Sequence, residues 1–241
     1  MKNNCFLSIV VPVYNESKRV KGLPKIVKFL NSKKFSWEII VVNDGSTDDT
    51  LAKLKNYQGK YKFQIINYRN NRGKGHAIKR GMLKARGKYI LFTDIDLSTP
   101  LKEFNSFIPH LTKHDVIIGT RKTHNSKLMI RQNMLREALG KGFTFLSRKI
   151  LGVNVSDFTC GFKCFSNNAA SKIFPKLTID RWGFDSEIMF LIGANNLSLK
   201  EVSVIWKNDP DTRVKFPQDI IRSLNDLIRI RLNNYRGLYS N

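Results

Sequence analysis

Apolar and polar positions follow a repeating order along the first hundred residues: a short apolar run, a mixed helical stretch, then another apolar run. Runs of roughly four to eight β-branched and aromatic residues are typical of buried strands. Such runs occur at 7–14, 38–43, 63–67 and 88–93. Helices are expected between them, at 17–32, from about Thr47 onward and at 76–86. This alternation predicts an α/β fold with a doubly wound, mostly parallel sheet.

The pattern is less regular after residue 97. Strand-like segments are expected at 115–119, within 157–165 and at 199–206, and helical ones at 126–150, 186–191 and 218–232. The sequence contains no internal repeat, low-complexity tract or long linker. We therefore expect residues 1–241 to form a single domain, which is a common arrangement for an α/β chain of this length.

Charge is the most unusual feature of the composition. The 42 Lys and Arg outnumber the 19 Asp and Glu, which gives a net charge of +23. Residues 51–93 alone carry twelve basic side chains and no acidic one. Such a field attracts polyanions: nucleic acid, phosphorylated small molecules or an anionic membrane surface. A solvated basic face without a partner is the alternative interpretation.

Several classes of protein are excluded by the rest of the composition. Hydrophobic residues make up 41% of the chain, enough to bury a core, so wholesale disorder is excluded. Three cysteines are too few for a disulfide scaffold. No apolar run approaches the length of a membrane-spanning helix, and the first residues do not resemble a signal peptide. These observations lead us to expect a cytoplasmic protein.

Two carboxylates directly follow the fourth expected strand, at Asp94 and Asp96. In an extended segment, residues two apart project to the same side, so the two side chains repel one another unless a cation lies between them. Hard oxygen ligands favour Mg²⁺ or Mn²⁺. The motif is short, and a turn or capping role is the alternative.

Other polar groups follow neighbouring strands. Asp44 and Gly45 end the second strand, and Tyr14-Asn15-Glu16 ends the first, where an aromatic ring can stack on a base. A basic glycine-rich loop, Arg72-Gly-Lys-Gly-His76, precedes a helix but lacks the spacing of a P-loop. Ligands of parallel sheets bind at the carboxyl ends of strands, so these groups are expected near Asp94.

In combination, these motifs resemble the family 2 glycosyltransferases, which have the nucleotide-diphospho-sugar transferase (GT-A) fold. The first half of the chain carries the resemblance in Val10-Val-Pro-Val-Tyr-Asn-Glu16, Asn43-Asp-Gly-Ser-Thr-Asp48, Arg72-Gly-Lys-Gly75 and Asp94-Ile-Asp-Leu-Ser-Thr-Pro100. The second half carries it in Gly119-Thr-Arg121, Asp157-Phe-Thr-Cys-Gly-Phe-Lys163, Trp182-Gly-Phe-Asp185 and Pro210-Asp-Thr-Arg213-Val-Lys215. These later motifs are similar to the polyprenyl-phosphate branch, which holds dolichyl-phosphate glucosyl- and mannosyltransferases.

The resemblance implies a role for each matching residue. It divides the chain into a nucleotide-sugar-binding half, about 1–118, and an acceptor-binding half, about 119–241. The implied nucleotide-sugar contacts are Pro12, Tyr14, Asn15, Glu16, Val42, Asp44, Gly45, Lys74, Asp94, Ile95, Asp96, Arg121, Arg213 and Lys215. The implied metal ligands are Asp94 and Asp96, with Ser98 where relatives can carry a further polar ligand. The implied contacts to the acceptor phosphate are Arg121, Arg131 and Arg136, and the implied catalytic residues are Asp96, Asp157 and Asp185.

The expected activity is inverting transfer of a hexose from a nucleotide sugar to a polyprenyl or dolichyl phosphate, assisted by Mg²⁺ or Mn²⁺. UDP-glucose is the first donor expected, with GDP-mannose as the other. An ionised acceptor phosphate is already a nucleophile, so Asp157 and Asp185 are expected to act as a weak base or to orient the acceptor.

The lipid acceptor must be reached at a bilayer. The basic, apolar-rich stretches 126–150 and 218–232 predict peripheral docking on an anionic cytoplasmic leaflet, with a membrane-anchoring subunit as a further candidate partner. The alternative is that both stretches are core-packing helices with solvated basic faces.

Three other functions stay open from the sequence. A family 2 enzyme acting on a saccharide of the cell envelope is the nearest one, and a catalytically inactive sugar-nucleotide-binding module is another. A nucleic-acid-binding protein would explain the charge, but the chain contains no zinc finger, RRM signature or basic zipper. We therefore expect no nucleic-acid partner.

Overall fold

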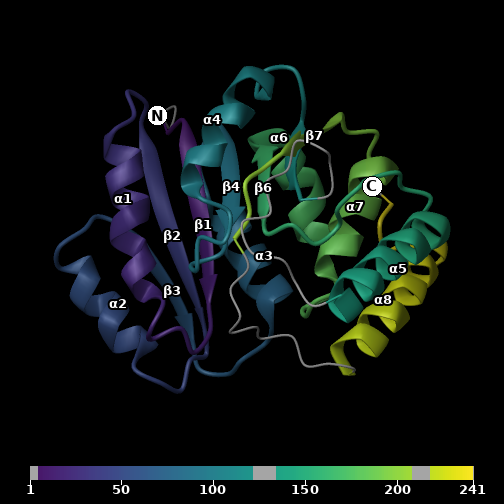
Figure 1. Ribbon diagram of the computed structural model, residues 1–241, viewed down its shortest axis with the longest axis horizontal. Coiled ribbons are helices and arrows are strands. Elements are labelled where there is room, and N and C mark those ends of the chain that lie inside the picture. Colours follow the sequence, from purple (N-terminus) through teal and green to yellow (C-terminus); the bar gives the residue numbers. More distant parts are fainter. Residues whose placement is uncertain (1–4, 122–133, 208–217, 241) are drawn as a thin grey trace.

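One seven-stranded sheet runs through the computed structural model, which describes residues 5–121, 134–207 and 218–240 (Figure 1). The strands are β1 (Leu7–Val13), β2 (Trp37–Asp44), β3 (Gln64–Tyr68), β4 (Tyr89–Thr93), β5 (Val116–Thr120), β6 (Phe162–Ser166) and β7 (Leu199–Ser203). Their order across the sheet is β3-β2-β1-β4-β6-β5-β7. Strand β6 runs antiparallel to both of its neighbours, and the other paired strands are parallel. The expected doubly wound, mostly parallel sheet is confirmed.

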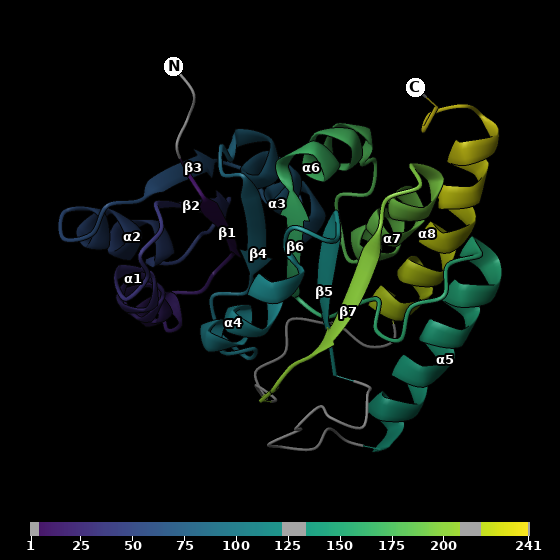
Figure 2. The same cartoon turned by 90° about the horizontal axis from the view of Figure 1, so that it is seen from above.

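Helices cover both faces of this sheet. They are α1 (Leu23–Asn31), α2 (Thr50–Gln58), α3 (Lys74–Lys84), α4 (Phe104–Phe107), α5 (Met134–Leu151), α6 (Asn167–Ile173), α7 (Phe184–Ala194) and α8 (Gln218–Tyr235). Short 3₁₀ turns adjoin several of them. Seen from above, α1, α2 and α4 lie on one side of the sheet, and α3, α6 and α7 lie on the other (Figure 2).

Strand alternation produces two separate hydrophobic cores. In β1, Ile9 and Val11 face the core beneath α1, whereas Val10 faces the core beneath α3, because successive side chains point to opposite faces. All seven residues of β1 are buried. A strand covered on both faces is typical of parallel sheets, and this explains its continuous run of apolar residues.

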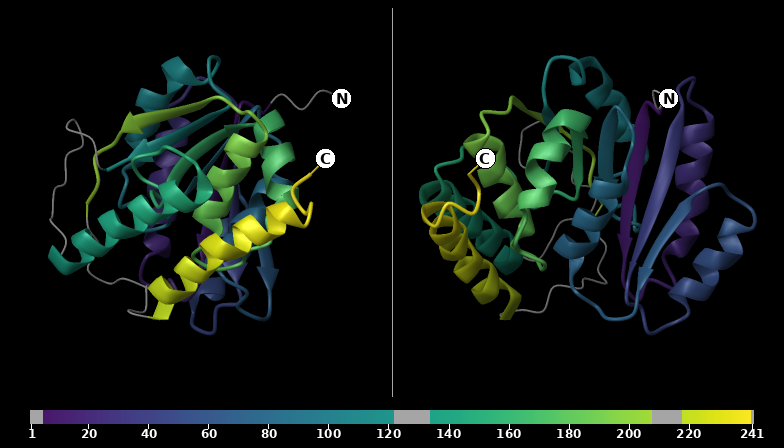
Figure 3. Two further views of the ribbon diagram at one scale, coloured as in Figure 1. Left: turned by 90° about the vertical axis from the view of Figure 1, so that its right-hand side faces the viewer. Right: turned by 180° about the vertical axis from the view of Figure 1, so that it is seen from behind.

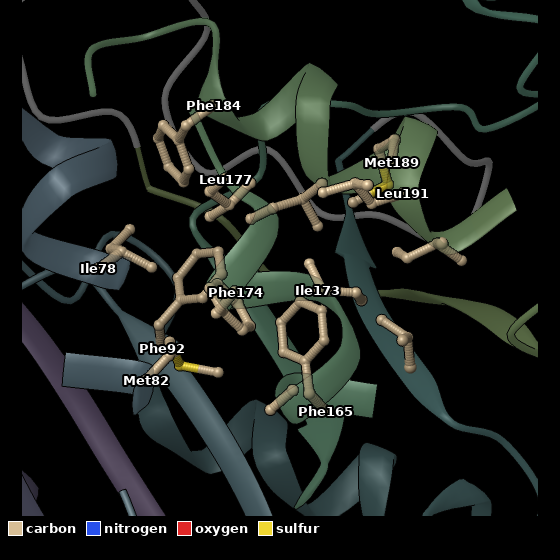
Figure 4. Packing of buried hydrophobic residues seen from close by; sticks show 14 of the residues in the cluster. Ile78, Met82, Phe92, Phe165, Ile173, Phe174, Leu177, Phe184, Met189 and Leu191 are labelled. Atoms are coloured by element: carbon tan, nitrogen blue, oxygen red, sulfur yellow. The ribbon is translucent and has the colours of Figure 1, made fainter. Parts of the chain in front are cut away.

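The larger core contains an aromatic cluster that crosses from strand to helix. Figure 4 shows Phe92, Phe165, Phe174 and Phe184 packed between the sheet and the helices on that face. The ring centroid of Phe92 lies 6.1 Å from that of Phe165 and 6.3 Å from that of Phe184. Because Phe184 is the first residue of α7, this packing fixes the beginning of that helix and hence the position of Asp185.

The sequence predictions of local structure differ from the fold in four places. The helix expected at 17–32 begins only at Leu23, because Pro24 occupies the first helical turn and a 3₁₀ turn precedes it. Helices α4 and α6 were not predicted. The segment 157–165 contributes a strand only from Phe162, and that strand runs antiparallel.

Helices α5 and α8 lie side by side on the outside of the molecule, beyond α7 (Figure 3). Leu151 of α5 and Leu227 and Ile230 of α8 are buried in the larger core, so each helix has one packed face. Within the described ranges, no helix combines the length and the apolar character that crossing a membrane requires.

Candidate functional site

The candidate site lies at the carboxyl ends of β1, β2 and β4. From β1 the chain adds β2 and then β3 on one side, and it then crosses back to place β4 on the other side of β1. The order of the strands therefore reverses at β1. Open α/β sheets bind their ligands in the crevice at such a switch point. Asp44, Tyr14 and Asp94 end or follow these three strands, so the structure brings them to one edge as predicted.

Strand β6 brings a second group of residues to the same edge because its direction is reversed. Phe162, its first residue, pairs with Thr93, the last residue of β4. The loop before β6, which carries Asp157 and Gly161, therefore adjoins the loop after β4. Arg121 reaches this edge from the end of β5.

Asp94 and Asp96 are brought together by a turn. The sequence argument assumed an extended backbone, but β4 ends at Thr93, and the amide of Leu97 donates to the carbonyl of Asp94 at 3.2 Å. Leu97 adopts a positive φ of 53° in this turn. The expected proximity is correct, whereas the expected geometry is wrong, since strand pairing stops one residue before the motif.

The two carboxylates are suited to a divalent cation. Partial desolvation and the charge of Asp94 raise the pKa of Asp96 above its ordinary value, although the backbone amide of Ser98 donates to Asp96 Oδ1 at 2.8 Å. A Cβ at Gly161 would lie 2.3 Å from Asp94 Oδ2, so only glycine leaves that oxygen its space. No cluster of three or more His, Cys, Asp or Glu side chains suited to a metal occurs in the described part of the chain. Mg²⁺ can bind to a protein through one or two carboxylates together with substrate phosphates, and a pair of carboxylates fits that arrangement.

Lys74 forms an ion pair with one of these carboxylates. Its Nζ lies 2.7 Å from Asp94 Oδ1, and both side chains are partly exposed. Burial alone would lower the pKa of Lys74, but the charges of Asp94 and Asp185 outweigh it, so the pKa is raised. A lysine ammonium thus points into the site, as the glycine-rich loop suggested.

The side chain of Asp44 is hydrogen-bonded to the loop that carries Lys74. Its buried carboxylate accepts hydrogen bonds from the backbone amides of Arg72 at 2.9 Å and Gly73 at 2.8 Å, and from Asn71 Nδ2 at 2.8 Å. Gly45 beside it has a φ of +66° and no space for a Cβ. Asp44 therefore anchors this loop in addition to any role toward a nucleotide.

Hydrogen bonds connect the loop after β1 to the loop after β2. Asn15, with a φ of 51°, receives a hydrogen bond on its Oδ1 from the Thr47 amide at 2.8 Å, and its own amide donates to Ser46 Oγ. Glu16 forms an ion pair with Arg19 at 3.0 Å. Tyr14 is 38% exposed, so its ring is available to a ligand.

Three residues implied by the resemblance have buried side chains at this edge. Pro12 and Val42 pair across β1 and β2, and Val42 packs against Gly81 of α3 in the larger core. Ile95 packs in the smaller core, and its carbonyl lies against Gly22. Any contact that these residues make with a nucleotide must involve their backbone.

Arg121 and Asp157 form a bidentate ion pair. Nε of Arg121 donates to Oδ2 at 2.7 Å and Nη2 donates to Oδ1 at 2.8 Å, while Asp157 is fully buried. Nη2 also donates to Thr159 Oγ1, and the ring of Trp206 lies 5.3 Å from the guanidinium carbon. The neighbouring carboxylate raises the pKa of Arg121 against the effect of burial, so its charge is permanent.

Asp185 has a partner that the sequence analysis did not single out. Lys163, which is wholly buried in β6, donates to Asp185 Oδ1 and to the carbonyl of Phe158 at 2.7 Å. The sequence contains one signal for it: a lysine between buried aromatic positions of a strand, Phe162-Lys-Cys-Phe165. A buried ammonium requires a partner, and Asp185 is the carboxylate present.

Four of the predicted site residues have side chains outside the part of the chain that the structure describes. Arg131, Arg213 and Lys215 lie outside the described ranges, and so does the side chain of Arg136, which belongs to α5.

Comparison with known proteins agrees with this architecture. The model of glycosyl transferase family 2 matches residues 8–174. A dolichyl-phosphate beta-glucosyltransferase of Dictyostelium discoideum is 36% identical over 98% of this chain and 77% of its own length. The enzyme of that name from Saccharomyces cerevisiae is also 36% identical, over 97% of this chain and 76% of its own.

Among solved structures, glucosyl-3-phosphoglycerate synthase from Mycobacterium tuberculosis, in complex with Mn²⁺, UDP-glucose and phosphoglyceric acid, has a similar fold. Its TM-score is 0.69 at 18% identity, covering 95% of this chain and 79% of that one. The fold and the carboxylates at the strand ends define a GT-A glycosyltransferase. The chain belongs to glycosyl transferase family 2.

Proposed function

We propose that this enzyme transfers glucose from UDP-glucose to a dolichyl or other polyprenyl phosphate, with inversion at the anomeric carbon. The observation that carries the proposal is the meeting of two carboxylates, Asp94 and Asp96, with two cations, Lys74 and Arg121, at one strand edge. Similarity to dolichyl-phosphate beta-glucosyltransferases over nearly the whole chain supports the donor sugar and the acceptor. A β-linked product from an α-linked donor requires inversion.

Asp94 and Asp96 are the residues proposed to hold a divalent cation, with Ser98 beside them. When bound, the cation neutralises negative charge on the departing diphosphate. Mn²⁺ is present in the structural neighbour together with UDP-glucose, and this supports divalent-cation use here, while Mg²⁺ fits the same oxygen ligands.

The chain's own residues have distinct proposed tasks. Tyr14 stacks on the base, Asn15, Glu16 and Asp44 shape the nucleotide pocket, and Lys74 contacts the diphosphate. Arg121 is aimed by Asp157 and binds a phosphate, since a guanidinium matches two phosphate oxygens. Arg213 and Lys215 are proposed to bind the diphosphate. Backbone atoms of Pro12, Val42, Gly45 and Ile95 are proposed to complete the pocket.

The acceptor step needs little proton transfer. A phosphate monoester is largely ionised near neutral pH, so its oxygen attacks the anomeric carbon as the bond to the nucleoside diphosphate breaks. Arg131 and Arg136 are proposed to hold this acceptor phosphate. Asp157 and Asp185 then orient charged groups, because each already accepts hydrogen bonds from a cation.

A transfer assay tests the proposal. Radiolabelled UDP-glucose and GDP-mannose are offered separately with a polyprenyl phosphate in detergent, with and without Mn²⁺ or Mg²⁺. The expected result is metal-dependent label from UDP-glucose in the lipid phase, which is lost in Asp96→Ala. Label from GDP-mannose would make mannose the sugar, and transfer only to a saccharide would make the enzyme one of envelope polysaccharide synthesis.

We further propose that the enzyme meets its lipid acceptor by docking on an anionic membrane through α8. Ile221, Ile228 and Leu232 form one exposed stripe on this helix, since they are spaced at seven and four residues, and they are 48–56% exposed. Arg222 and Arg229 lie beside the stripe on the helix, Arg236 directly follows the helix, and all three are exposed. This combination is typical of interfacial helices.

Cosedimentation with phosphatidylserine vesicles at low salt tests the docking. Binding is expected for the wild type and for Asn234→Glu, which adds a charge elsewhere on α8, but not for Ile228→Glu/Leu232→Glu. Absence of wild-type binding would contradict direct docking and would favour a membrane-anchoring subunit on the cytoplasmic face.

A further inference from the structure

The ammonium group of Lys74 already contacts Asp94, one of the two proposed ligands of the divalent cation. Its ammonium lies 2.7 Å from Asp94 Oδ1, and the other oxygen of this carboxylate faces Gly161. The ring of Trp182 lies 5.8 Å from the same ammonium. A divalent cation that approaches Asp94 therefore meets a positive charge at contact distance from one of its ligands.

The backbone beneath Lys74 is fixed from two sides. The carboxylate of Asp44 accepts hydrogen bonds from the backbone amides of Arg72 and Gly73. On the other side, the backbone amide of His76 donates to the carbonyl of Asp180 at 3.0 Å. A Cβ at Gly73 would lie 2.4 Å from that same carbonyl. These hydrogen bonds hold the loop backbone in place, so Lys74 can change partner by rotation of its flexible four-carbon side chain alone.

Asp185 supplies a second negative charge near Lys74, but this carboxylate already binds another cation, the ammonium of Lys163. Its charge acts on Lys74 together with that of Asp94, but its Oδ1 is taken by the buried Lys163. Asp94 is thus the carboxylate for which the ammonium and a divalent cation compete.

We propose that Lys74 is a charge gate that couples binding of the divalent cation to binding of the nucleotide. This inference rests on the proposed function, in which a nucleoside diphosphate and a divalent cation share the site. In the nucleotide-free protein the ammonium neutralises Asp94 and disfavours a second cation. The diphosphate offers the ammonium several anionic oxygens, so Lys74 turns to it and releases Asp94. Because coupling is reciprocal, the cation also strengthens nucleotide binding.

Titration of Mn²⁺ into the purified protein, followed by electron paramagnetic resonance of the free ion, measures the gate without turnover. The wild type is expected to bind Mn²⁺ weakly alone and at least about tenfold more tightly with saturating UDP. Lys74→Met is expected to bind Mn²⁺ alone about five- to tenfold more tightly than the wild type, with a correspondingly smaller gain from UDP. Lys74→Arg keeps the charge and is expected to bind Mn²⁺ alone as weakly as the wild type.

A matched control comes from the same helix. Lys84 is exposed at the other end of α3, about 15 Å away by the rise of a helix, so Lys84→Met removes an equal charge and is expected to leave Mn²⁺ binding unchanged. Equal or weaker Mn²⁺ binding in a folded Lys74→Met, beside a wild type that binds both Mn²⁺ and UDP, would overturn the gate alone. A wild type that binds neither Mn²⁺ nor UDP would overturn the proposed function as well.

Discussion

The carboxylate of Asp157 receives two parallel hydrogen bonds from Arg121, at 2.7 and 2.8 Å, in a fully buried position. Thr159 and the ring of Trp206 complete the surroundings of the guanidinium. A carboxylate held this way has both oxygens engaged by a permanent cation, which is a poor arrangement for a base. We therefore expect Asp157 to act by positioning Arg121.

Asp157→Asn tests this role. The side-chain amide of asparagine places an NH₂ donor where Asp157 has an acceptor oxygen, and this donor faces an N–H group of Arg121. The guanidinium of Arg121 should therefore lose its fixed orientation. We expect at least a tenfold fall in kcat/KM, expressed mainly as a higher KM for the substrate whose phosphate Arg121 binds. Thr159→Val, which removes a single contact of Arg121, should change kcat/KM less than threefold. A fall in kcat with unchanged KM would instead support Asp157 as the base.

Gly161→Ala should damage the proposed metal site while sparing the fold. The new methyl group would lie 2.3 Å from Asp94 Oδ2, so the carboxylate must move. We expect Mn²⁺ binding and activity to fall at least tenfold, with the melting temperature changed by only a few degrees. Gly193→Ala in α7, where the nearest atom is 4.0 Å away, is the control and should keep both. Unchanged Mn²⁺ affinity in Gly161→Ala would separate this glycine from the site.

The edge formed by β1, β2 and β4 was predictable because each of these strands is a local apolar run followed by its own polar turn. Asp44 and Asp94 could be expected near one another on topology alone. The contribution of β6 was not predictable in this way. Its antiparallel partners, β4 and β5, are distant in sequence, and only that pairing brings Gly161 and Asp157 to the edge.

Lys163 shows a second limit of sequence patterns. A lysine within a strand is ordinarily expected to face solvent, yet this one is fully buried because Asp185 compensates its charge. Asp44 shows a third limit. The hydrogen bonds that it accepts from the backbone amides of Arg72 and Gly73, in a loop nearly thirty residues away, have no signal in the sequence. Contacts of this kind depend on tertiary packing.

Tyr239→Phe should destabilise the protein through a buried carboxylate. The Tyr239 hydroxyl donates to Glu187 Oε1 at 2.6 Å, and Glu187 also accepts from the side chain and amide of Thr178 and the amide of Ile179. A hydrogen bond to a charged group contributes about 1.5–3 kcal/mol, so urea unfolding should show a loss in this range. Tyr235→Phe removes a hydroxyl from a side chain that is 91% exposed and should change the free energy of unfolding by less than about 0.5 kcal/mol.

Thiol reactivity should distinguish the three cysteines. Burial and the nearby Asp157 raise the pKa of Cys160 to about 11, and burial raises the pKa of Cys164 further. Burial and Glu38 also raise the pKa of Cys5, but this thiol is only partly buried and so is accessible to reagent. The thiolate is the reactive form, and at pH 8 both buried thiols are almost wholly protonated and shielded from reagent. Ellman's reagent should therefore titrate one thiol in the native protein and three in denaturant. Native Cys5→Ser should then show none, and a rapid reaction of either remaining thiol in that variant would contradict the burial of Cys160 and Cys164.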